Sequence, residues 1–128
     1  MITKPYLGGA INGCSDADAA DWRNWLIHMH FPNAINPMVR DYRGQEQENY
    51  REIVDLDKRD IRRSEALIVR YMKPSVGTSM EILYAWDLGL PIVVICDPDT
   101  PVSPWLRYHS SAIVYNFSDA VAFIEKIE

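Results

Sequence analysis

The chain has 128 residues, of which 48% are hydrophobic and 24% charged, and its formal net charge at pH 7 is −5. This is enough chain to bury a core, so we expect residues 1–128 to form a single globular domain. The net negative charge and the lack of a dense basic stretch argue against binding to nucleic acid.

No apolar run approaches the thickness of a bilayer, and no signal peptide precedes Met1. Cys14 and Cys96 have the spacing of neither a metal site nor a disulfide framework. We therefore predict a cytoplasmic protein that binds no membrane, no metal and no other cofactor.

The chain begins with a predicted strand from Ile2 to about Leu7, followed by a glycine-rich turn. A helix capped by Ser15 or Asp16 then runs to about His30, with its apolar residues on one side. Glycines after a first strand are typical of a turn that holds a phosphate group, but they also form ordinary tight turns. The dinucleotide fingerprint GxGxxG is absent, so both interpretations stay open.

A short second strand is predicted at 33–36, and Pro37 closes it. The polar loop that follows carries Arg40 and Arg43, which either meet an anion or pair with Asp41 and the nearby glutamates. A loop of this length in a small domain is usually functional or mobile.

The next predicted helix runs from Tyr50 to Ser64, and its interleaved basic and acidic residues are typical of a solvated face. Asp57 lies four residues before Ile61, on the thin apolar side of this helix, which places it toward the interior. A carboxylate near the edge of the core is costly unless it has a partner or a function.

A third strand is predicted at 65–71, and a loop leads from it into a helix capped by Thr78 or Ser79. Glu81 then falls in the first turn of that helix, where peptide N–H groups favour an anion. There it either complements the helix dipole or stays ionised as a carboxylate suited to act as a nucleophile. The β-branched run at 92–96 predicts a buried fourth strand.

The chain ends with a predicted helix at 104–109, a fifth strand at 112–115, and a helix at 119–127 capped by Ser118. Alternating strands and helices predict an α/β fold with a parallel sheet. We expect a flavodoxin-like (Rossmann-like) three-layer sandwich whose five strands have the order 2-1-3-4-5.

Ligands of such sheets bind beyond the C-terminal ends of strands 1 and 3. The end of strand 1 offers Tyr6 and the turn Gly8–Asn12, and the end of strand 3 offers the loop Pro74–Gly77 and Glu81. We therefore predict one crevice that contains all of these residues.

Four stretches carry a family resemblance: YLGGAING, NPMVRDYRG, DLDKRDIRRSEALIVRY and SVGTSMEILYAWDLGLPIVVI. Together they resemble the nucleoside 2-deoxyribosyltransferase family, which also includes 5′-nucleotide N-glycosidases. The most specific part is the pattern G-x-x-M-E-x-x-x-A, from Gly77 to Ala85. The resemblance implies the α/β fold described above, no cofactor, and a homodimer or higher homo-oligomer with shared active sites.

It also implies the activity: cleavage of the N-glycosidic bond of (deoxy)nucleosides or their 5′-monophosphates. The family's nucleophilic glutamate falls on Glu81, its supporting aspartate on Asp57 and its first-strand tyrosine on Tyr6. A carboxylate traps the developing oxocarbenium ion as a covalent glycosyl-enzyme, while the second assists the leaving base. The sugar then passes to a free nucleobase in a transferase, or to water in a hydrolase.

The resemblance further implies a set of substrate-binding residues: Gly8, Gly9, Ala10, Ile11, Asn12, Asp41, Ser75, Gly77, Ser103, Trp105 and Arg107. Ser75 stands where the transferases carry an aspartate and where the nucleotide hydrolases carry a serine that contacts a 5′-phosphate. Ser103 and Arg107 match the hydrolase pattern S-x-x-x-R, which a neighbouring subunit lends to the site. Asn12 departs from the arginine that those hydrolases often have.

Ser103 has a second interpretation as a helix cap. The alternatives for the whole protein are a 5′-monophosphate-specific N-glycosidase without base exchange and a non-catalytic nucleotide-binding module.

Overall fold

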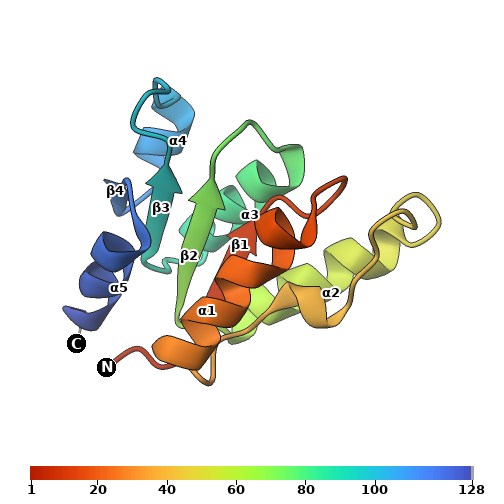
Figure 1. Cartoon of the computed structure of the whole chain (residues 1–128), viewed down its shortest axis with the longest axis horizontal. Helices are drawn as coiled ribbons and strands as arrows, with labels where there is room; N and C mark the ends of the chain where they lie inside the picture. The colour runs from red at the N-terminus through yellow and green to blue at the C-terminus, as the bar shows by residue number, and fades with distance from the viewer. Residues whose placement is uncertain (128) are drawn as a thin grey trace.

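The structure is a computed structural model that describes residues 1–127. Its centre is a parallel sheet of four strands in the order β1-β2-β3-β4 (Figure 1). The strands are β1 (Pro5–Gly9), β2 (Ala66–Tyr71), β3 (Ile92–Cys96) and β4 (Ala112–Val114). Each strand runs into the next through a helical crossover, which is the connection that parallel pairing requires.

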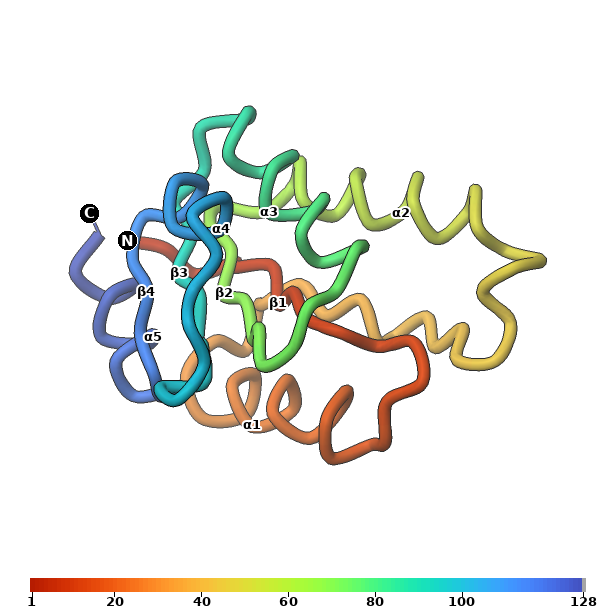
Figure 2. Tube along the Cα trace, turned by 90° about the horizontal axis from the view of Figure 1, so that it is seen from above, coloured from red at the N-terminus to blue at the C-terminus, as the bar shows by residue number. Residues whose placement is uncertain are grey.

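Helices cover both faces of this sheet (Figure 2). The helical segments are η1 (Ala17–Asp21), α1 (Trp22–Met29), η2 (Pro37–Val39), α2 (Tyr50–Arg63), α3 (Val76–Asp87), α4 (Pro104–Tyr108) and α5 (Phe117–Glu125). One core lies between the sheet and the helices α1 and α5, and it contains Leu7, Leu26 and Ile124. The other lies under α2, α3 and α4, and it contains Tyr6, Ile61 and Ile82.

Side chains of successive strand residues point to opposite faces, and this alternation places the first site residue. Leu7 enters the core under α1, so Tyr6 enters the core under α2 and α3. The described part of the chain therefore has the predicted α/β architecture of a single parallel sheet with helices on both faces.

The prediction of five strands in the order 2-1-3-4-5 is wrong, because the described residues form four strands. The segment 33–36 reaches the edge of β1, but only Ile35 pairs, in a single parallel bridge to Tyr6. Pro37 opens η2 immediately afterwards, and the Asn36 side chain caps it by accepting from the Met38 N–H at 2.9 Å. The chain therefore turns away before a strand can extend.

Three predicted element boundaries also need correction. β1 runs from Pro5 to Gly9, whereas the predicted strand began at Ile2 and ended near Leu7. Asn116, not Ser118, caps α5, because its side chain accepts from the Asp119 N–H. Ser75, rather than Thr78 or Ser79, caps α3. This last change moves Glu81 out of the first helical turn, which alters its electrostatics.

No helix within residues 1–127 has the length and apolarity that crossing a membrane would require.

Candidate active site

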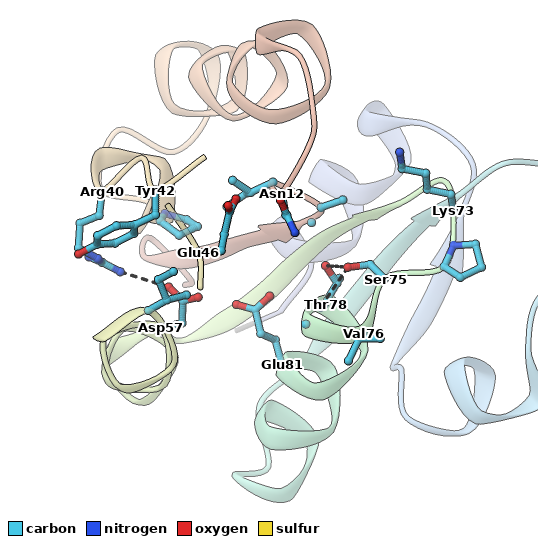
Figure 3. A pocket seen from close by; sticks show the side chains of 17 residues that line it. Asn12, Arg40, Tyr42, Glu46, Asp57, Lys73, Ser75, Val76, Thr78 and Glu81 are labelled. Atoms are coloured by element: carbon cyan, nitrogen blue, oxygen red, sulfur yellow. Dashed lines mark hydrogen bonds and ion pairs between the residues drawn. The ribbon is translucent and has the colours of Figure 1, made fainter. Parts of the chain in front are cut away.

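A cavity of about 480 Å³ opens at the C-terminal ends of β1 and β2 (Figure 3). Its walls are the turn after β1, the segment that contains η2 and the following loop, α2, and the start of α3. The lining residues are Gly9, Ala10, Ile11, Asn12, Pro37, Arg40, Tyr42, Glu46, Ile53, Asp57, Lys73, Pro74, Ser75, Val76, Gly77, Thr78 and Glu81. The predicted crevice therefore exists, and it brings together Glu81, Asp57 and the two glycine-containing loops.

Glu81 lies on the cavity side of α3, where it meets a fully buried tyrosine. The hydroxyl of Tyr6 donates a hydrogen bond to Oε2 of Glu81. Burial is the main cause that raises the pKa of Tyr6 well above its usual value, and the charge of Glu81 adds to it. Tyr6 therefore keeps its proton at neutral pH and orients the carboxylate as a donor.

Burial raises the pKa of Glu81 to about 7, and the neighbouring charge of Asp57 contributes in the same direction. The Tyr6 hydrogen bond and the buried Arg23 act against this shift but do not cancel it. The prediction that Glu81 lies in the first turn of its helix is wrong. The cap is Ser75, so the carboxylate lies beyond the N–H groups that are free at the helix end.

Asp57 faces the cavity from α2, as predicted, and it has a cationic partner. Oδ1 of Asp57 lies 3.3 Å from Nη2 of Arg40. Burial raises the pKa of Asp57 to about 6, although Arg40 lowers it by its charge and hydrogen bond. Glu81 and Asp57 thus form a pair of carboxyl groups that titrate near neutral pH.

Asp60 is a site-supporting residue that the sequence analysis missed, since it was counted with the solvated charges of its helix. It is 2% exposed, and its Oδ2 lies 2.7 Å from Nη2 of Arg40. Arg59 and Arg63 pair with its other oxygen at 3.0 and 3.5 Å. The signal was present in the spacing, because Asp57, Asp60 and Ile61 share one face of a helix.

Arg23 is a second residue that sequence reasoning missed. It is fully buried, and it donates to the backbone oxygens of Leu7 and Gly9 at 3.0 Å each and to that of Ala19. Burial lowers its pKa to about 10, so it stays charged at neutral pH. Arg23 therefore fixes the end of β1 and places a positive charge where it lowers the pKa values of Glu81 and Asp57.

Gly9 is needed at the point where Arg23 holds the backbone. A Cβ atom there would lie 3.0 Å from the Arg70 carbonyl oxygen and 3.1 Å from the Trp22 ring. The remaining predicted residues of this turn, from Ala10 to Asn12, line the cavity, while Gly8 is buried within β1.

Hydrogen-bond donors gather at the other end of the cavity, where α3 begins. Ser75 caps the helix by accepting from the Thr78 N–H at 3.4 Å, and its hydroxyl lies 3.0 Å from that of Thr78. Lys73 and Asn12 line the same end (Figure 3). Gly77, in the first turn of α3, also lines the cavity. The cavity is therefore acidic at the α2 end and rich in donors at the start of α3.

Asp41 does not line the cavity. It is exposed and binds Arg43 at 2.7 Å, and Arg43 also reaches Asp16 at 2.7 Å and the Cys14 carbonyl oxygen at 3.1 Å. Of the two interpretations offered for Arg43, the structure shows carboxylate pairing. Arg40 also pairs with carboxylates, but with Asp57 and Asp60 rather than with Asp41.

Ser103, Trp105 and Arg107 lie apart from this cavity, on or beside α4. The Ser103 hydroxyl accepts from the Trp105 N–H at 3.2 Å, so it acts as the helix cap that was one of its two interpretations. Ser103 and Trp105 line a second cavity of about 230 Å³ between α3 and α4. Within residues 1–127, no group of three or more acidic, histidine or cysteine side chains is arranged to hold a metal ion.

Comparison with protein-family models and with curated proteins gives no match. Solved structures with the same single-domain α/β fold do match over nearly the whole chain. The CMP N-glycosidase BcmB of Clostridium botulinum superposes with a TM-score of 0.61 at 13% identity, covering 95% of this chain and 98% of its own. A conserved protein from Enterococcus faecalis V583 gives a TM-score of 0.68 at 16% identity, covering 98% and 99%. At these identities the likeness shows the fold alone, and it confirms the single-domain α/β class of fold but not the predicted number and order of strands.

Proposed function

We propose that this protein is an enzyme that cleaves the N-glycosidic bond of nucleosides or their 5′-monophosphates. One observation carries the proposal: Glu81 and Asp57 converge in the main cavity, and a buried tyrosine orients Glu81. Enzymes that cleave glycosidic bonds typically use a pair of carboxyl groups that flank the scissile bond. The fold shared with a CMP N-glycosidase supports the same class of reaction.

In the proposed first step, an oxygen of Glu81 attacks C1′ of the sugar. The C1′–N bond breaks, and its electron pair goes to the base nitrogen. The protonated form of Asp57 gives its proton to the departing base, and Tyr6 holds the attacking carboxylate. The products of this step are the free base and a glycosyl ester on Glu81.

In the second step, water attacks C1′ and displaces Glu81, while Asp57 takes the proton of the water. Hydrolysis and base transfer differ only here, since a second nucleobase that replaces water yields a new nucleoside. Both outcomes use the same residues, so the choice between them depends on which acceptor occupies the site of the departed base.

The two pKa values allow the singly protonated pair that the first step needs. Because the pair titrates near 6 and 7, it holds one proton over part of the neutral range. Because Glu81 has the higher pKa, this proton lies mainly on Glu81, and the first step proceeds from the minor form in which Asp57 holds the proton and Glu81 is ionised.

The polarity of the cavity supports one orientation of the substrate in this proposal. Asp57 marks the position of the base, Glu81 that of C1′, and the start of α3 that of the 5′-phosphate. The Ser75 hydroxyl, the N–H groups of the first helical turn and Lys73 suit a dianion. Arg107 and Ser103 of a neighbouring subunit would complete the phosphate site, as the resemblance implies.

The test is a panel of nucleosides and 5′-monophosphates, incubated with and without a second free base and followed by chromatography. Release of base supports the hydrolase, and appearance of a new nucleoside or nucleotide supports the transferase. Saturable binding without release or exchange of base from any member would instead identify a nucleotide-binding module.

A further inference from the structure

Glu46 presents a buried acceptor atom inside the main cavity. Its Oε2 atom is inaccessible to solvent and has no hydrogen-bond partner, and it is the one buried side-chain oxygen or nitrogen within residues 1–127 of which this is true. Native proteins satisfy nearly all such atoms, because an unpaired buried acceptor is costly. When such an acceptor lines a cavity, we expect a bound ligand to donate the missing hydrogen bond.

The cations of the surrounding loop are not available to Glu46. Arg40 binds Asp57 and Asp60, while Arg43 binds Asp41 and Asp16. Figure 3 shows Glu46 across the cavity from Asp57 and Glu81, toward the end that Tyr42 and Arg40 occupy. This is the end where the proposed mechanism places the base.

We propose that Glu46 determines base specificity by accepting a hydrogen bond from the exocyclic amino group of the base. The inference rests on the proposed function for the position of the base in the cavity. It narrows the substrate class to nucleotides of amino-bearing bases, of which cytosine is the smallest.

The chemistry of the bases explains why a carboxylate would discriminate. Cytosine presents an amino group at position 4, whereas uracil presents a carbonyl oxygen there, and a carboxylate repels that oxygen. The only N–H on the pairing edge of uracil lies between two carbonyl oxygens, so approach to it is opposed on both sides. A lost hydrogen bond to a charged group changes specificity by about ten- to hundredfold.

The experiment compares kcat/KM for cytidine and uridine 5′-monophosphates, which differ on the base edge only at positions 3 and 4. The proteins are the wild type, Glu46→Gln and Glu46→Ala, with Glu48→Gln as the control because Glu48 is exposed on the same loop. We expect the wild type and the control to prefer the cytidine nucleotide at least tenfold. Both Glu46 variants should lose most of that preference while keeping the thermal unfolding of the wild type.

Binding of the same two nucleotides to Glu81→Gln, and to Glu81→Gln with Glu46→Gln, separates this inference from the proposed function. Preferential binding of the cytidine nucleotide that needs Glu46, without cleavage in the wild type, supports the inference and overturns the function. Cleavage of both nucleotides at equal rates, or a preference unchanged in folded Glu46 variants, overturns the inference alone. No binding and no cleavage of either nucleotide would overturn both.

Discussion

At the scale of single residues, the site is organised by the charges that surround two carboxyl groups. Glu81 and Asp57 are held in a partly buried cavity, and burial raises the pKa of each. The buried Arg23 lowers both pKa values, and Arg40 lowers that of Asp57. Asp60 anchors Arg40 at 2.7 Å, so it acts on the cavity through its partner.

This arrangement predicts how activity depends on pH. We expect kcat/KM of the wild type to follow a bell-shaped profile with limbs near pH 6 and 7, since the active form holds one proton on the pair. In Asp57→Asn the alkaline limb should disappear, because no proton donor remains. The acid limb should remain, because Glu81 must still lose its proton before it can attack.

The rate at the optimum should fall about 10²- to 10⁴-fold in Asp57→Asn, as is typical for loss of general acid–base help. Initial rates of base release between pH 4.5 and 9 measure both effects. A wild-type profile that stays flat over this range, or an alkaline limb that persists in the variant, would contradict the assigned roles.

At the scale of elements, α3 does two things: it carries Glu81 and it offers its N-terminus to the cavity. The cap is made by Ser75, whose side chain accepts from the Thr78 N–H. Helix N-termini attract anions because their first N–H groups have no partner within the helix. The same serine is therefore placed to stabilise the helix and to meet a phosphate.

Ser75→Ala should reveal both roles. Loss of the cap should lower the free energy of unfolding by about 1 kcal/mol. Loss of a phosphate contact should reduce the preference for a 5′-monophosphate over its nucleoside about tenfold. Thermal unfolding and paired kcat/KM values give the two numbers. A lower stability with an unchanged substrate ratio would leave Ser75 as a cap only.

Sequence patterns were sufficient for most elements, and insufficient where one residue decides between neighbouring conformations. The strand at 92–96 has a strong β-branched signal and forms as predicted, and the helix predicted at 50–64 forms over 50–63. The segment 33–36 is too short for its propensity to outweigh the turn at Pro37, so it yields one bridge instead of a strand. Cap positions were misplaced because several Ser, Thr and Asn residues compete near each helix start.

Sequence patterns also predicted the position of the site, but not all of the residues that form it. Strand ends and loops indicated where Glu81 and the glycine-containing turns would meet, because the topology of a parallel sheet fixes that edge. Asp57 was placed toward the interior by its helical spacing and assigned to the site by the resemblance. The roles of Arg23, Asp60 and Glu46 depend on burial and on partners distant in the chain, which local patterns do not contain. Asp41 was placed by resemblance alone, and Arg43 holds it outside the cavity.

At the scale of the whole molecule, the buried carboxyl groups link function to stability. The pKa of Glu81 rises from its ordinary value of 4.5 to about 7 on folding, so the folded protein binds its proton more tightly. The stability that this proton contributes is complete below pH 4.5 and is lost as the pH rises through 7. The ionised form of Glu81, which attacks the sugar in the proposed mechanism, therefore lowers the free energy of unfolding.

Glu81→Gln should therefore be more stable than the wild type at pH 8, on the order of 2 kcal/mol. The difference should fade at pH 5, where the wild-type carboxyl is protonated. Chemical denaturation measures this difference in the free energy of unfolding at both pH values. Glu48→Gln, at an exposed position, is the control and should match the wild type at each pH. A variant less stable than the wild type at pH 8 would show that the ionised carboxylate is not under strain.

The surface around α4 suggests a site of self-association. The region around α4 exposes large aromatic side chains, among them Trp105, which is 76% exposed, and Tyr108. Aromatic residues of this kind are enriched in the cores of protein interfaces. Trp105→Ala should weaken self-association and reduce activity together, because Ser103 and Arg107 lie on the same segment. Sedimentation and rate measurements check this, and a fully active wild-type monomer would remove the prediction.

The most direct test of the central claim is release of free base by the wild type and by Glu81→Gln. Both proteins are incubated with cytidine and deoxycytidine 5′-monophosphates at pH 6.5, and cytosine is quantified by chromatography. We predict that the wild type releases cytosine in proportion to time, and that the folded variant is slower by about 10³-fold or more. A wild type that releases no cytosine from either nucleotide, or a variant that matches it, would contradict the claim that Glu81 cleaves an N-glycosidic bond.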